Sequence, residues 1–125
     1  MTARILLIDD DPALRAGIGR YLEAMGYQVF EADNGESALK VLEANTLDLV
    51  LTDINMPEMD GIELILALAE RFPHIPIITM SGGGLIPKEH LLADARMLGV
   101  LRTIAKPFDL DELGELVEQV LAEAG

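Results

Sequence analysis

Five side chains of this sequence have the clearest potential for chemistry, and each stands at the end of a short apolar run. They are Asp9, Asp10, Asp53, Ser81 and Lys106, and the runs that they close cover residues 5–8, 47–53, 75–80 and 100–105. Short, nearly continuous apolar runs are typical of strands buried on both faces of a parallel sheet. Because parallel strands bring their carboxyl ends to one edge of the sheet, we expect these side chains to lie together there.

Gathered at one edge, these groups would form a site for phosphoryl chemistry. Taken singly, each has an ordinary explanation as a turn residue, a helix cap or a solvated side chain. Three neighbouring carboxylates, however, repel one another unless they share a cation, and their oxygen atoms are ligands that suit Mg²⁺. A carboxylate nucleophile, a metal ion, a hydroxyl donor and a lysine cation are the parts that phosphoryl transfer uses.

The segments between the apolar runs carry the three- and four-residue spacing of amphipathic helices. Asp11 is placed to cap the first helix with Pro12 in its first turn, and Gly26 ends the pattern. A further strand is predicted at residues 27–32, and four more helices are expected near residues 36–44, 62–72, 87–98 and 110–121. A strand thus precedes a helix five times, which predicts a doubly wound α/β domain with a parallel sheet between two helical layers.

The composition limits the classes of partner. With 125 residues, of which half are hydrophobic, the chain is predicted to form a single domain over residues 1–125, with no further domain after the last helix. The formal net charge of −13 argues against direct binding to nucleic acid or to an anionic membrane. There is no cysteine, no signal segment and no apolar run long enough to span a membrane, so we expect a cytoplasmic protein.

Three motifs, with a hydroxyl residue between the second and the third, resemble those of the receiver domains of two-component response regulators. They are Ile-Asp-Asp-Asp-Pro at residues 8–12, Asp-Ile-Asn-Met-Pro-Glu-Met-Asp-Gly at 53–61 and Lys-Pro-Phe at 106–108. The resemblance is to single-domain receivers of the chemotaxis type and covers essentially the whole chain. It implies a flavodoxin-like fold, with five parallel strands in the order 2-1-3-4-5 flanked by five helices.

The resemblance also implies a role for the acidic residues. Asp53 would accept a phosphoryl group from a histidine kinase or a histidine phosphotransfer protein. Together with Asp9, Asp10 and the backbone carbonyl of Asn55, Asp53 would bind Mg²⁺. The protein would then be a phosphoacceptor for signalling rather than an enzyme, apart from assisting its own phosphorylation and dephosphorylation. Its altered surface would meet an unidentified downstream protein.

The remaining site residues concern the phosphoryl oxygens and the switch. Ser81 and Lys106 would each bind one phosphoryl oxygen, and the resemblance implies a cis peptide bond between Lys106 and Pro107. Many receivers carry an aromatic residue three positions before this lysine, where this chain has Thr103, and three glycines follow Ser81. We therefore hypothesise that a bond from Ser81 to the phosphoryl group orders the glycine-rich loop, while Thr103 fills vacated space.

The last helix bears on the oligomeric state. No lysine or arginine occurs after Lys106, whereas the helix carries Asp111, Glu112, Glu115, Glu118 and Glu123. Because two such helices would repel each other, we expect a monomer.

Two alternative interpretations remain open at this point. Asp9-Asp10-Asp11 also fits the Asp-x-Asp start of haloacid-dehalogenase-like phosphatases, in which Asp9 would be the nucleophile, but Asp53 and Lys106 are then less well explained. The chain could also be a binding module of receiver shape that is never phosphorylated. The complete set of five site residues argues against that second alternative.

Overall fold

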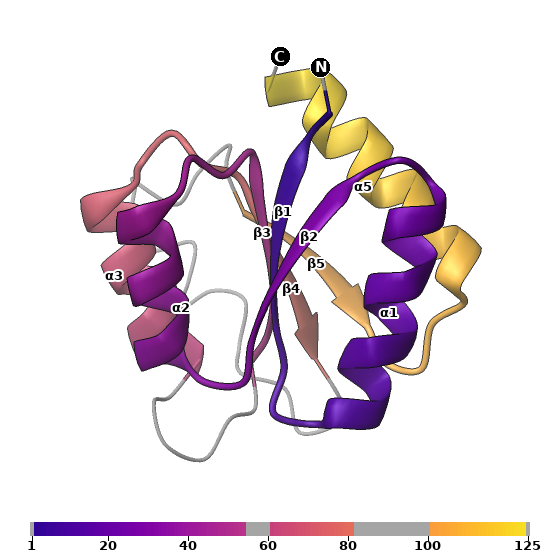
Figure 1. Ribbon diagram of the computed structural model, residues 1–125, viewed down its shortest axis with the longest axis horizontal. Coiled ribbons are helices and arrows are strands. Elements are labelled where there is room, and N and C mark those ends of the chain that lie inside the picture. The colour runs from indigo at the N-terminus through magenta and orange to yellow at the C-terminus, as the bar shows by residue number, and fades with distance from the viewer. Residues whose placement is uncertain (1, 55–60, 82–100, 125) are drawn as a thin grey trace.

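The computed structural model describes residues 2–54, 61–81 and 101–124, which form a five-stranded sheet with helices on both faces (Figure 1). Every strand pair is parallel, and the strand order is β2-β1-β3-β4-β5. The strands are β1 (Arg4–Ile8), β2 (Gln28–Ala32), β3 (Leu49–Asp53), β4 (Ile77–Ser81) and β5 (Leu101–Ala105). The predicted doubly wound sheet and its strand order are confirmed.

Four helices lie in the described part of the chain: α1 (Pro12–Ala24), α2 (Gly35–Ala44), α3 (Gly61–Arg71) and α5 (Leu110–Ala124). The helix that was expected near residues 87–98 lies outside the described residues. None of the described helices is long and apolar enough to cross a membrane.

Local signals set the ends of α1 and α2. The Asp11 carboxylate accepts hydrogen bonds from two backbone N–H groups in the first turn of α1, with Pro12 at the first helical position. Past the other end, Gly26 has a φ of 101°, a left-handed conformation that glycine adopts without a steric penalty. The Asn34 side chain caps α2 by accepting a hydrogen bond of 2.8 Å from the Ser37 N–H.

Alternate residues of the strands belong to two separate cores, one on each face of the sheet. Leu6 and Ile8 of β1 pack with Val50 of β3 in the core beneath α2 and α3. Ile5 and Leu7 point the other way, into the core beneath α1 and α5. The two helical layers lie on opposite sides of the strands in Figure 1. Burial on both faces explains why β1, β3 and β4 are nearly continuous apolar runs.

The strands differ from the prediction mainly at their first residues. β3 begins at Leu49, two residues later than expected, directly after Asp48, whose carboxylate accepts the Arg4 N–H at 2.8 Å. β4 begins at Ile77, after Pro76, because proline has no N–H to donate to a neighbouring strand. Hydrophobicity therefore marked where each strand lies, while hydrogen bonding decided where its ladder begins.

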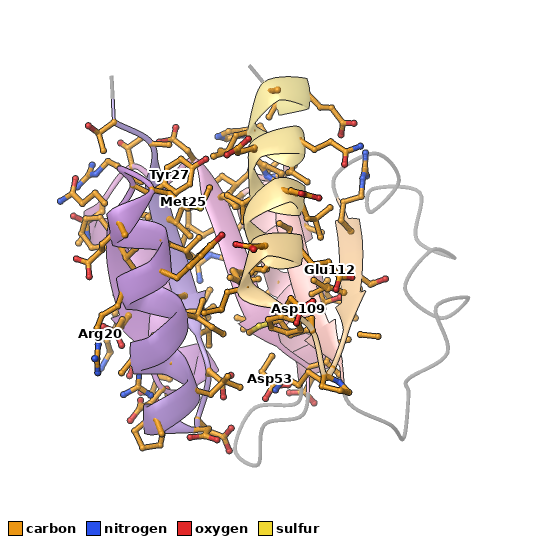
Figure 2. The ribbon with its side chains drawn as sticks, turned by 90° about the vertical axis from the view of Figure 1, so that its right-hand side faces the viewer. Arg20, Met25, Tyr27, Asp53, Asp109 and Glu112 are labelled. Carbon is orange, nitrogen blue, oxygen red and sulfur yellow. The ribbon has the colours of Figure 1, made fainter. Side chains whose placement is uncertain are left out.

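Helices α1 and α5 approach each other closely at Gly114, on the face of the molecule that Figure 2 presents. A Cβ atom at Gly114 would lie 3.0 Å from Met25 Sδ and 3.0 Å from Tyr21 Cε2. The Tyr21 hydroxyl also donates a hydrogen bond of 2.8 Å to the Asp111 carboxylate at the start of α5. The absence of a side chain at Gly114 is therefore what allows α5 to rest against α1.

Alanine substitutions at two helical glycines should consequently have opposite effects on the free energy of unfolding. A Cβ atom at Gly17 would meet nothing within 4 Å, so Gly17→Ala should add about 0.5–1 kcal/mol through its better helix propensity. Gly114→Ala should remove about 1 kcal/mol or more, because the methyl group presses on Met25 and Tyr21. Urea unfolding of both variants measures the difference. Equal stabilisation by both would show that α1 and α5 do not meet closely at Gly114.

Candidate functional site

The register of the central strands places two aspartates side by side. Ile8 of β1 pairs with Thr52 of β3, so the residues that follow, Asp9 just after β1 and Asp53 at the end of β3, lie side by side. Asp53 lies at the carboxyl end of the strands, the lower end of the sheet in Figure 2. The chain runs outward from β1 to β2 and then returns to the other side of β1 for β3. Ligands of open α/β sheets bind at this kind of reversal in strand order.

Three carboxylates form a cluster at this edge. Asp9, Asp10 and Asp53 each offer an oxygen atom, and these atoms all lie within 4.8 Å of one another. Asp9 is 0% exposed and Asp53 4% exposed, whereas Asp10 faces solvent. The structure therefore brings together the three acidic residues that the sequence predicted to be neighbours. Asn55, the fourth expected metal ligand, lies outside the described residues.

Lys106 brings positive charge to the cluster from the loop after β5. Its Nζ atom lies 3.2 Å from Asp53 Oδ2 and 3.9 Å from Asp9 Oδ2. The first distance is that of a hydrogen bond, and the second is an ion pair without one. The peptide bond between Lys106 and Pro107 is cis, as the resemblance implied. One cation thus partly offsets the charge of two buried carboxylates.

Asp9 is held in place and still has one oxygen atom to offer. Its Oδ1 atom accepts a hydrogen bond of 2.9 Å from the Asp11 N–H, whereas its buried Oδ2 atom has no hydrogen-bond partner among the described residues. Burial raises the pKa of Asp9, and the charges of Asp53 and Asp10 raise this pKa further. The Asp11 hydrogen bond and Lys106 oppose that shift. An orphaned carboxylate oxygen that faces other carboxylates fits a divalent cation with oxygen ligands, so these residues suit Mg²⁺.

The other two predicted residues lie on the neighbouring strands. Ser81 is the last residue of β4 and pairs with Ala105 of β5, which places its backbone at the edge of the sheet that carries the cluster. The position of its side chain lies outside the described part of the structure. Thr103 is exposed on β5 and pairs with Thr79. Their roles in phosphoryl binding and in the switch stay predictions.

A largely apolar groove beside Lys106 was not predicted from the sequence. Its volume is about 630 Å³, and it lies between α1 and the loop that joins β5 to α5. Its lining includes Leu14 and Gly17 of α1 together with Phe108 and Leu110. The lining residues are separated by some ninety positions in the chain, so no local pattern could have revealed the groove.

Arg15 is a second feature that sequence reasoning missed. Its Nη1 atom donates a hydrogen bond of 2.7 Å to the backbone carbonyl of Asp9, and its Nε atom donates one of 3.0 Å to Glu31 Oε1. The available signal was a cation four residues after the helix cap Asp11, in a chain with only nine lysines and arginines.

Comparisons with known proteins agree with this geometry. The profile of the response regulator receiver domain matches residues 5–118. The receiver protein CpdR of Brucella abortus is 39% identical over 97% of this chain and 98% of its own length. Sporulation initiation phosphotransferase F of Bacillus subtilis is 35% identical over 97% of this chain and 95% of its own length. The crystal structure of a CheY-like receiver domain protein from Methanospirillum hungatei superposes with a TM-score of 0.89, at 27% identity, covering 99% of this chain and 97% of that one.

Some relatives are much longer than this chain. The transcriptional regulatory protein GlrR of Escherichia coli is 35% identical over 98% of this chain, which spans only 27% of GlrR. The family match sets aside the haloacid-dehalogenase-like alternative, in which Asp9 was the nucleophile. The family profile matches nearly the whole sequence. The structure agrees with it in the strand order 2-1-3-4-5, in the aspartate cluster and in the lysine beside that cluster. The chain therefore belongs to the receiver domains of response regulators, the phosphoacceptor domains of two-component signalling.

Proposed function

We propose that Asp53 is the phosphoacceptor of this domain and that the donor is a histidine kinase or a histidine phosphotransfer protein. The observation that carries the proposal is the 3.2 Å contact between Lys106 Nζ and Asp53 Oδ2, made beside two further carboxylates. A carboxylate at the reversal of strand order, with a cation already in contact, is arranged to receive a group whose negative charge that cation offsets.

In the proposed reaction a carboxylate oxygen of Asp53 forms a bond to phosphorus while the bond between phosphorus and the donor histidine nitrogen breaks. Lys106 offsets the charge on the phosphoryl oxygens. Asp9 and Asp10 hold Mg²⁺, which supplies charge neutralisation at the phosphoryl group when it is bound. Because the same residues would stabilise the attack of water on the acyl phosphate, the domain assists its own dephosphorylation as well as its phosphorylation.

Three further assignments rest on the motif pattern. The Asn55 carbonyl is a metal ligand, the Ser81 hydroxyl donates to a phosphoryl oxygen, and Ser81 with Thr103 forms the switch. The backbone position of Ser81, paired with Ala105 at the site edge, supports its assignment. Thr103 is exposed on β5 and pairs with the residue two positions before Ser81, so a movement of β4 would reach this surface.

We further propose that the phosphodonor docks in the groove beside Lys106. It lies next to the acceptor site and is lined largely by apolar side chains, including Leu14 and Phe108. An apolar helical face of a donor would be buried there, as in other helix-in-groove complexes. Docking at this place would bring a phosphohistidine close to Asp53.

The exposed face of α5 favours two further proposals: the protein is a monomer, and its downstream partner has a basic surface. All five acidic residues of the helix that the sequence singled out are exposed, and Glu123 pairs with Arg102 at 2.8 Å. Two copies of this face would repel each other, whereas a partner with a basic surface would be attracted.

Replacing the acceptor should abolish phosphorylation without changing the fold. Asp53→Asn keeps the side-chain shape but removes the nucleophilic oxygen, so labelling by acetyl phosphate with Mg²⁺ should vanish, as read by intact-mass measurement. Lys106→Ala should label more slowly than the wild type. Asp48→Asn, at the opposite edge of the sheet, is the matched control and should label normally. Label on Asp53→Asn at the wild-type rate would refute the assignment.

The raised pKa of Asp9 predicts a dependence of stability on pH in the metal-free protein. A group whose pKa is higher in the folded state contributes stability at low pH, and this contribution is lost as the pH rises through that pKa. Asp9→Asn mimics the neutral form, so at pH 7 in EDTA the variant should be more stable than the wild type. The advantage should disappear as the pH falls below the ordinary pKa of 3.8. Urea unfolding at the two pH values measures it.

Mg²⁺ should reverse the order of the two proteins at pH 7. Binding to the folded state alone stabilises the wild type by about 2.7 kcal/mol when Mg²⁺ is in hundredfold excess over its dissociation constant. Asp9→Asn should gain far less, because it lacks one of the ligands. Equal gains for both proteins would place the ion elsewhere.

Filling the groove should separate donor docking from the chemistry at Asp53. Gly17→Met projects a side chain into the groove, so phosphotransfer from a kinase found by screening the host's histidine kinases should slow by about tenfold. Labelling by acetyl phosphate should not change. Ala24→Met, at the exposed far end of α1, is the matched control. If Gly17→Met accepts phosphoryl groups from the kinase at the wild-type rate, the donor docks on another surface.

A further inference from the structure

Arg15 joins three segments at the edge of the acidic cluster. It lies on α1, its Nη1 atom donates to the carbonyl oxygen of Asp9 after β1, and its Nε atom donates to Glu31 on β2. The Arg15 side chain is 20% exposed, whereas the Glu31 side chain is 48% exposed. The Arg15 side chain is therefore mostly covered, and its two donors reach one acceptor just after β1 and another on β2.

With the bond from Arg15, every polar atom of Asp9 except one is hydrogen-bonded within the described residues. The Asp9 N–H donates to the Ala32 carbonyl at 3.1 Å, and Asp9 Oδ1 accepts from the Asp11 N–H at 2.9 Å. With Arg15 on its carbonyl at 2.7 Å, the polar atom of Asp9 that lacks a hydrogen bond among the described residues is Oδ2. Asp9 Oδ2 lies 3.9 Å from Lys106 Nζ, and Asp9 belongs to the cluster that suits a divalent cation.

A second arginine, Arg71, forms an ion pair of the same length but makes it at the surface. Arg71 donates to Glu43 at 3.0 Å, the distance of the Arg15–Glu31 pair, but both side chains of this pair are about half exposed. A surface pair of this kind contributes little to stability. What distinguishes Arg15 is the additional bond to the backbone of a residue in the acidic cluster. A guanidinium can serve two such acceptors at once because its donors form a rigid planar fork, which an ammonium group lacks.

We propose that Arg15 is a positioning residue for the divalent-cation site, and that Glu31 holds Arg15 in place. Arg15 fixes the turn between β1 and α1 so that Asp9 Oδ2 and Asp10 face the cation. The inference rests on the proposed function in one respect, the binding of Mg²⁺ by Asp9 and Asp10. Groups that orient metal ligands from behind typically change metal affinity by 10- to 100-fold when they are removed.

The test measures Mg²⁺ affinity by calorimetry on the full chain without any phosphodonor. Arg15→Met should raise the dissociation constant about tenfold. Arg15→Lys should restore only part of the affinity, because one ammonium group cannot make both bonds. Arg71→Met removes an equally long ion pair away from the cluster and should leave the affinity unchanged. Equal affinity of the wild type and Arg15→Met would overturn the positioning role while leaving the proposed function intact.

A second-site variant distinguishes positioning from a general loss of stability. Gly17→Ala adds helix propensity to α1 and should restore the melting temperature of Arg15→Met without restoring its Mg²⁺ affinity. Recovery of both would show that Arg15 acts only through stability and would overturn the proposal. Absence of Mg²⁺ binding by the wild type would overturn the metal site itself, and the inference with it.

NMR spectroscopy tests the fixed turn directly. The amide resonances of Asp10 and Asp11 should shift in Arg15→Met more than in Arg71→Met, and equal shifts would count against a fixed turn.

Discussion

Asp9 and Asp53 are acidic groups buried side by side, and the rest of the structure can be understood from what that arrangement requires. Two carboxylates out of contact with water repel each other, so a positive charge must lie close to them. Lys106 supplies it from the loop after β5, across the intervening strand β4, and this is possible only if the ends of β1, β3 and β5 lie at one level of the sheet. The sheet achieves this because cores on both faces clamp it.

Helix α1 connects this edge of the sheet to the groove and to α5. Residues at its start hold Asp9, through the N–H of Asp11 and the bond from Arg15. Its middle lines the groove at Gly17, beside Lys106. Its last turn meets α5 at Gly114, where Tyr21 and Met25 pack. A displacement of α1 would therefore alter the aspartate cluster, the groove and the α5 contact together.

The sequence alone determined the order and type of the elements in the described part of the chain, and which residues stand at the strand ends. These are local properties: Asp11, Pro12 and Gly26 mark the ends of α1 whatever packs against it, and an apolar run of five residues between helical patterns forms a strand. The clustering of Asp9, Asp10 and Asp53 followed as soon as the strands were taken to be parallel. The strand order itself came from the resemblance to a family, since hydrophobic pattern does not specify which strands are neighbours.

Only the tertiary structure decided the contacts between residues that lie far apart in the chain. Three features depend on how helices and strands are placed relative to one another. They are the 3.2 Å contact of Lys106 with Asp53, the hydrogen bonds of Arg15 to Asp9 and Glu31, and the groove beside α1. Gly114 makes the point most simply. From the sequence, this glycine predicts only a weaker helix propensity. The structure shows its packing role, because an added Cβ would meet Tyr21 and Met25. Side-chain periodicity specifies which face of a helix is buried, but the depth of burial is set by the shape of the surface opposite.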